Sequence, residues 1–150
     1  MLNYAEPELA EQAAKLATRL GPEDRVLLEG ELGAGKSTFA RYLLEALGVT
    51  RLFEGSPTFS IAHEYMTRIG PAIHMDFYRL RSFEEIEQAG IPDYFWARSN
   101  LVICEWLSNW PEFEKKVIQS RKAKSQIWRV KLSGVESEPS LRQIELKMLS

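Results

Sequence analysis

The apolar residues in the first third of the chain repeat with a helical spacing, then a strand spacing, and then a helical spacing again. The first apolar stripe consists of Leu9, Ala13, Leu16, Ala17 and Leu20. Intervals of three and four residues predict an amphipathic helix, which Gly21-Pro22 ends. RVLLEG, residues 25–30, is typical of a short buried strand, and a second helical stripe runs from Phe39 to Leu47 before Gly48. Residues 30–38 therefore lie between a predicted strand and a predicted helix.

Shorter patterns follow this unit. The predicted strands are residues 59–65, 72–80, 101–106, 127–132 and 142–149. Residues 82–90 predict a helix with Ser82 as its N-cap, Glu85 completing a capping box and Gly90 at its end. Residues 109–124 predict a short helix followed by a polar loop. Because the order begins α-β-α and ends β-β, we expect an α/β fold, a mixed sheet with a parallel centre and antiparallel C-terminal edge strands.

Composition narrows the classes of protein that fit. The 150 residues contain no repeat or Gly/Ser linker, so one domain over residues 1–150 is expected. The net charge of -2 gives no general positive field for DNA. The single cysteine, Cys104, excludes a disulfide framework, and its apolar setting predicts a buried, inert thiol. The N-terminus lacks signal-peptide features and no apolar run approaches the ~18 residues of a membrane span, so we expect a cytoplasmic protein.

The stretch GELGAGKST supplies the first candidate chemistry. Gly30 to Ser37 fits the Walker A pattern G-x-x-x-x-G-K-[ST] in the strand–loop–helix context that this motif requires. Its glycines allow backbone N–H groups to cradle phosphates, Lys36 would bridge the β- and γ-phosphates, and the Ser37 hydroxyl would ligate Mg²⁺. No N-K-x-D element for guanine occurs, so ATP is the expected nucleotide.

Two acidic residues are candidates for a carboxylate close to the Mg²⁺ of such a site. Glu105 ends the apolar run LVIC, and Asp76 lies in HMDFYR. Carboxylates at the C-terminal ends of parallel strands would point toward the phosphate loop, although either residue could instead be a surface acid. His74, Asp76 and Tyr78 alternate along one predicted strand face, and for His74 a structural hydrogen bond is favoured over a chemical role.

Four motifs in this order resemble the TsaE family, also called YjeE, small bacterial ATPases for the threonylcarbamoyladenosine (t6A) modification of tRNA. They are GELGAGKST, SPTF at 56–59, HMDFYRL at 74–80 and CEW at 104–106. The residues that would hold the triphosphate are Gly33, Ala34, Gly35, Lys36, Ser37 and Thr38. The resemblance also implies that Ser37 and Glu105 hold Mg²⁺ and that Asp76 is needed for hydrolysis.

Further roles are implied by the same resemblance. Thr58 would sit in a loop that responds to the γ-phosphate, and Trp106 would lie at the nucleotide edge or at a partner surface. Glu6 aligns near the base, and Arg142 aligns with an arginine that approaches the nucleotide. The chain departs from the family in having Ser37 where threonine is usual and Leu107 where proline is common. A segment with five basic residues, Lys115, Lys116, Arg121, Lys122 and Lys124, is a solvated loop or a contact for tRNA or an acidic partner.

The resemblance implies a weak, partner-stimulated ATPase that acts with TsaD and TsaB and resets their complex after each modification cycle. Contact with tRNA would be weak or indirect. Arg79 and Arg142 are candidate arginine fingers, but no motif fixes either on the γ-phosphate. Two other classes stay open. A small-molecule kinase would use the basic segment at 115–124 as a lid, and a nucleotide-gated binding module would bind ATP without useful hydrolysis.

Overall fold

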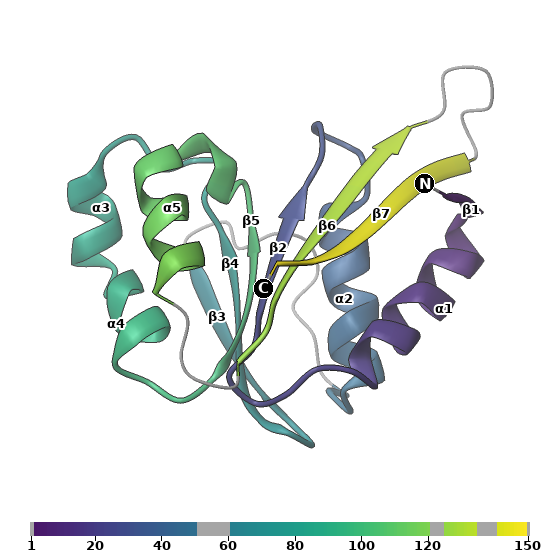
Figure 1. Cartoon of the computed structure of the whole chain (residues 1–150), viewed down its shortest axis with the longest axis horizontal. Coiled ribbons are helices and arrows are strands. Elements are labelled where there is room, and N and C mark those ends of the chain that lie inside the picture. Colours follow the sequence, from purple (N-terminus) through teal and green to yellow (C-terminus); the bar gives the residue numbers. More distant parts are fainter. Residues whose placement is uncertain (1, 51–60, 121–124, 135–140, 150) are drawn as a thin grey trace.

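The computed structural model describes residues 2–50, 61–120, 125–134 and 141–149 (Figure 1). Its strands are β1 (Leu2–Ala5), β2 (Arg25–Glu29), β3 (Ala62–Thr67), β4 (Gly70–Asp76), β5 (Leu101–Glu105), β6 (Ile127–Gly134) and β7 (Leu141–Leu149). Its helices are α1 (Glu6–Ala17), α2 (Lys36–Ala46), α3 (Phe83–Gln88), α4 (Ile91–Trp96) and α5 (Pro111–Gln119), with a 3₁₀ turn at Leu107–Asn109.

These strands form one mixed sheet in the order β1-β7-β6-β2-β5-β4-β3. The four central strands β6, β2, β5 and β4 pair with one another in parallel. β7 pairs antiparallel with β6, which confirms the parallel centre and the antiparallel C-terminal strands. The other antiparallel strands are β1 beside β7 and β3 beside β4. The parallel strands all end at the same edge of the sheet, and this edge is where α/β proteins bind ligands.

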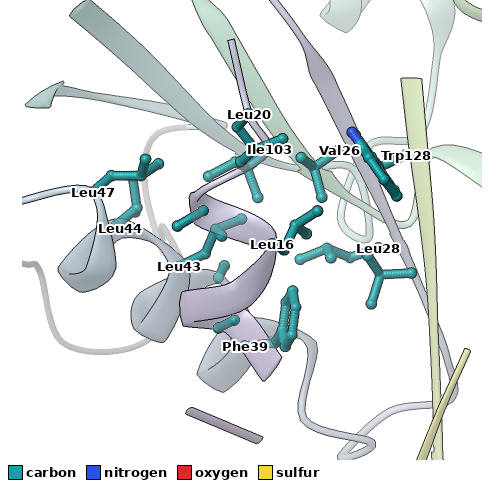
Figure 2. Packing of buried hydrophobic residues seen from close by; sticks show 14 of the residues in the cluster. Leu16, Leu20, Val26, Leu28, Phe39, Leu43, Leu44, Leu47, Ile103 and Trp128 are labelled. Carbon is teal, nitrogen blue, oxygen red and sulfur yellow. The ribbon is translucent and has the colours of Figure 1, made fainter. Parts of the chain in front are cut away.

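Helices cover both faces of the sheet in three layers (Figure 1). One core lies between the sheet and the pair α1 and α2, and includes Leu16, Phe39, Leu43 and Ile103 (Figure 2). The other core packs α3, α4 and α5 against alternate strand residues such as Met75 and Cys104. Because helices cover both faces of the sheet, β5 is buried along its whole length and β2 is buried from Arg25 to Leu28, which explains their continuous apolar runs.

Several expectations about the elements need correction. The order begins with β1, so the expected α-β-α start is wrong. The strand expected over 72–80 ends at Asp76, because the N–H of Tyr78 turns back to Oδ1 of Asp76 at 2.9 Å. The strand expected over 59–65 is β3, Ala62–Thr67, with residues 59 and 60 outside the described residues. Gly90, with φ 72°, ends α3 as expected but also precedes α4, which the apolar pattern did not predict.

The helix beginning after Ser82 shows why local signals succeeded there. The Ser82 hydroxyl accepts the N–H of Glu85 at 3.3 Å, which is the expected N-cap. The Glu85 carboxylate reaches the N–H of Arg81 at 3.3 Å, one residue before the position in a standard capping box.

Cys104 is fully buried, as expected, and burial raises the pKa of its thiol. Among the described helices, none has the length and apolar character needed to span a bilayer.

Candidate nucleotide site

The loop between β2 and α2 has a backbone that only glycines adopt without strain. Gly33 has φ 81° and Gly35 has φ 106°, both in the left-handed region. At Gly30, a Cβ would lie 2.3 Å from the carbonyl oxygen of Leu132, so this position excludes a side chain by direct contact. The loop can therefore run close to β6 before it turns into α2.

Lys36, the first residue of α2, is almost completely buried beneath this loop, with 4% of its surface exposed. Its Nζ donates to the carbonyl oxygens of Gly30 and Glu31 at 2.6 and 2.8 Å. Burial lowers the pKa of Lys36, while the nearby carboxylates of Glu105 and Asp76 oppose that shift. The two carbonyl oxygens thus hold Nζ of Lys36 inside the loop, where phosphate oxygens would compete for it.

Glu105 reaches the start of α2 from the end of β5. Its two carboxylate oxygens lie 3.0 and 3.1 Å from the hydroxyl oxygen of Ser37. Its Oε2 also lies 2.6 Å from Nε2 of His74, and both side chains are buried. A hydroxyl and a carboxylate side by side are hard oxygen ligands of the kind that Mg²⁺ takes in phosphate sites. The donor set therefore fits the expected metal.

Asp76 is the neighbour of Glu105 across the β4–β5 pair. A cavity of about 430 Å³ lies above these two strand ends. Its walls come from three places: the phosphate loop and the start of α2, the strand ends of β4 and β5, and the residues that follow them. The lining residues are Leu32, Gly33, Gly35, Lys36, Ser37, Thr38, Asp76, Tyr78, Arg79, Glu105 and Trp106.

Trp106 closes one side of this cavity. Nζ of Lys36 lies 4.1 Å from the centroid of its ring, and the ring of Tyr78 packs on it with 4.9 Å between centroids. Among the described residues, Trp106 is the only residue other than glycine with a positive φ, at 63°. A backbone conformation of this kind is costly for a residue with a Cβ and occurs often at functional sites.

A larger cavity, of about 940 Å³, lies on the other side of the phosphate loop. Residues 29–32 and 131–134 line it together with Trp106 and Ser108. It shares Leu32 and Trp106 with the smaller cavity but contains none of Lys36, Ser37 and Glu105. The groups of the expected phosphate and metal site gather in the smaller cavity, which is therefore the candidate nucleotide site.

Some expected site residues are placed only by their secondary-structure element or lie outside the described residues. Thr58 and the SPTF motif lie outside the described residues, as do Arg121, Lys122 and Lys124 of the basic segment. Glu6 is the first residue of α1, and Arg142 pairs with Tyr4 in the β1–β7 ladder. Of the expected phosphate-binding residues, Ala34 is buried, and the N–H of Ala34 donates to the carbonyl of Glu31 at 3.0 Å.

Reasoning from the sequence left two features of this site open. It gave Arg79 no fixed position, and the structure places Arg79 on the cavity wall. It left the role of His74 undecided, and the structure brings the imidazole to the carboxylate of Glu105. The HMDFYR pattern carried part of this signal, because His74 and Asp76 alternate on one strand face. The pairing of that face with Glu105 depends on the neighbouring strand.

A buried parallel sheet with a strand–glycine loop–helix unit at its carboxyl edge defines a P-loop NTPase-like fold. The family model described as "Threonylcarbamoyl adenosine biosynthesis protein TsaE" matches residues 4–136, so the chain belongs to the TsaE family. Named TsaE relatives include one from Bacillus subtilis, 42% identical over 101 residues, and one from Rickettsia felis, 39% identical over 101 residues.

These matches cover 67% of this chain in both cases, but only 61% and 58% of the respective relatives, less than two thirds of their length. Among solved structures, the crystal structure of Bacillus subtilis YdiB matches 99% of this chain and 86% of its own chain. Its TM-score is 0.67 at 26% sequence identity. The similarity of fold thus extends over nearly the whole chain, beyond the segment in which the sequences align closely.

Proposed function

We propose that this chain, as one domain over residues 1–150, is an ATP-binding and slowly ATP-hydrolysing accessory subunit in t6A modification of tRNA. It would act in the cytoplasm with TsaD and TsaB, and contact tRNA weakly or through those partners. Membership of the TsaE family supports the pathway, since the family is named for threonylcarbamoyladenosine biosynthesis. The observation that carries the ATPase assignment is the Ser37–Glu105 pair in the same cavity as Lys36.

The residues of this cavity would have separate roles in phosphoryl transfer. Lys36 would release its loop carbonyls and bind the β- and γ-phosphates, together with N–H groups at the start of α2. Ser37 and Glu105 would hold Mg²⁺, which neutralises charge that develops on the phosphates. Asp76 would orient the attacking water, and its Oδ1 is already held by the N–H of Tyr78.

The proposed ATPase would be slow in isolation because, among the described residues, no contact fixes an arginine toward the proposed phosphate position. Arg79 lines the cavity wall without a motif that assigns it this role. An arginine finger supplied by a partner is worth about 10³–10⁵ in rate in related phosphoryl-transfer enzymes. A partner that docks over Trp106 would add this charge and exclude water. In α5, Lys115 and Lys116 are exposed and available for an acidic surface or for tRNA.

The test measures t6A formation and phosphate release in mixtures of tRNA, TsaD and TsaB with and without this chain. We expect modification to require the chain and phosphate release to rise by about tenfold or more when the partners are added. Lys36→Ala should abolish that rise, because the substitution removes the phosphate contact. Equal turnover by the chain alone would contradict the proposal and favour a self-sufficient enzyme such as a kinase. Modification that proceeds without ATP turnover would instead indicate a nucleotide-gated binding module.

A further inference from the structure

His74 contacts Glu105, one of the two residues that would hold Mg²⁺. His74 is on β4, two residues before Asp76, and Asp76 pairs with Glu105 of β5. The three side chains therefore share the sheet face that α2 covers. Nε2 of His74 lies 2.6 Å from Oε2 of Glu105, and the two side chains are only 8% and 3% exposed.

The chemistry of the two groups gives the direction of this hydrogen bond. An ionised carboxylate can only accept, so Nε2 of His74 carries the hydrogen and donates it to Oε2. The hydroxyl of Ser37 approaches both carboxylate oxygens from the phosphate side. The carboxylate of Glu105 is therefore held by hydrogen-bond partners on two elements, His74 on β4 and Ser37 on α2.

We propose that His74 is a positioning residue that orients the carboxylate of Glu105 for Mg²⁺. This inference rests on the proposed function, since it concerns the same metal. When Ser37 ligates a cation through an oxygen lone pair, its O–H can still donate to Glu105. His74 gives the carboxylate of Glu105 a second hydrogen bond, from a different element. Such partners behind a metal ligand typically contribute 10–100-fold in metal affinity.

Two substitutions separate positioning from simple packing. His74→Gln places a side-chain N–H the same number of bonds from Cα as Nε2, so it retains a donor. His74→Met fills a similar space without a donor. The experiment titrates ATP binding to each full-length variant by calorimetry, in EDTA and over a range of Mg²⁺ concentrations. The readout is the ratio of ATP affinities with and without Mg²⁺.

For His74→Met we expect this ratio to fall by about 10–100-fold, and for His74→Gln to recover most of it. A merely structural role would lower both affinities together and leave the ratio unchanged, which would overturn the inference. Failure of His74→Gln to recover more than His74→Met would overturn it as well. In a Glu105→Gln background, His74→Met should change the ratio no further, because the carboxylate that it orients is gone.

One measurement needs no variant at His74. NMR of the protein labelled with ¹⁵N-histidine should show that Nε2 of His74 carries a hydrogen. The signal of this nitrogen should shift when Mg²⁺ and ATP are added together. An unprotonated Nε2 would overturn the inference even if a variant failed to fold. Wild-type protein that binds Mg²⁺ and ATP with this His74 dependence, yet releases no phosphate with partners present, would refute the proposed function alone. Wild-type protein that does not bind Mg²⁺ and ATP would refute both.

Discussion

Replacing Trp106 by alanine should strengthen ATP binding, because the indole ring and the phosphates would compete for the ammonium group of Lys36. Nζ of Lys36 lies 4.1 Å from the ring centroid, and the lysine is 4% exposed. A cation–π contact at a largely desolvated site contributes about 1–2 kcal/mol. If ATP has to displace the ring, removing it increases ATP affinity by about 5- to 30-fold, since 1.4 kcal/mol is a factor of ten.

The choice of alanine isolates the ring from the backbone. Trp106 has φ 63°, a conformation that is costly for any residue with a Cβ. Alanine keeps the Cβ, so the strain of the backbone is the same as in the wild type. Glycine would remove both the ring and this backbone strain, and the two effects on affinity could not be separated. Trp106→Phe is the graded control, because phenylalanine has a weaker cation–π interaction and should give an intermediate gain.

Isothermal titration calorimetry of ATP with Mg²⁺ measures the effect directly. An affinity that falls in Trp106→Ala would show that the ring contacts the nucleotide in the complex, and would refute the competition. An unchanged affinity would mean that Lys36 reaches the phosphates without leaving the ring, which refutes it equally. Tyr78→Ala offers a further check, since the ring of Tyr78 packs against the ring of Trp106 and its loss should give a smaller gain in affinity.

Three further predictions concern charged side chains that are buried or partly buried. Asp76→Asn should lower the rate of ATP hydrolysis by ~10²-fold or more with little change in ATP binding. Glu105→Gln should instead weaken the Mg²⁺ dependence of ATP binding. If the two variants behaved identically in both assays, the separate roles of these acids would be contradicted. Arg25→Met should lower the free energy of unfolding by about 2–5 kcal/mol in a denaturant titration, because two buried carbonyls lose their donor; a loss below about 1 kcal/mol would contradict it. Burial raises the pKa of Glu114, so its contribution to stability is largest below its unfolded pKa and declines as pH rises. Thermal unfolding should therefore show wild type gaining stability relative to Glu114→Gln as pH falls from about 7 to about 4.5.

Arg25 illustrates a structural role that no sequence motif indicates. It begins β2, and its side chain is 2% exposed between the sheet and the helices of the second face. Its guanidinium donates to the carbonyl of Val117 and to the carbonyl of Phe95 at 2.7 Å. These carbonyls lie at the ends of α5 and α4, so one arginine satisfies backbone groups from two helices. A single charged residue before an apolar run does not predict such a contact, because its partners are 70 and 92 residues away.

The elements that the sequence predicted correctly are those whose cause is local. The helix stripes of α1 and α2, the apolar runs of β2 and β5, and the N-cap at Ser82 all depend on residues a few positions apart. The glycine loop between β2 and α2 belongs to the same group, because its conformation requires the absence of side chains within the loop itself. Among these local features, the glycine loop is also one of the four motifs that carried the resemblance to the TsaE family.

The errors arose where the cause is distant in the sequence. β1 has four residues and no marked alternation, and it exists as a strand because β7, more than a hundred residues later, offers it an edge. α4 has six residues, too few to show a helical stripe, and it is stabilised by packing Ile91 and Phe95 into the second core. For segments this short, tertiary packing decides the conformation over intrinsic propensity.

For this protein, then, the sequence by itself determined the phosphate loop, its flanking strand and helix, and the identity of the acids that could face a metal. Only the tertiary structure decided which groups those acids touch. It brought Glu105 against Ser37 and His74, and it put the ring of Trp106 over Lys36. The physical reason is that each of these contacts joins residues on different elements. Their distances follow from strand register and helix packing, which the whole chain sets together.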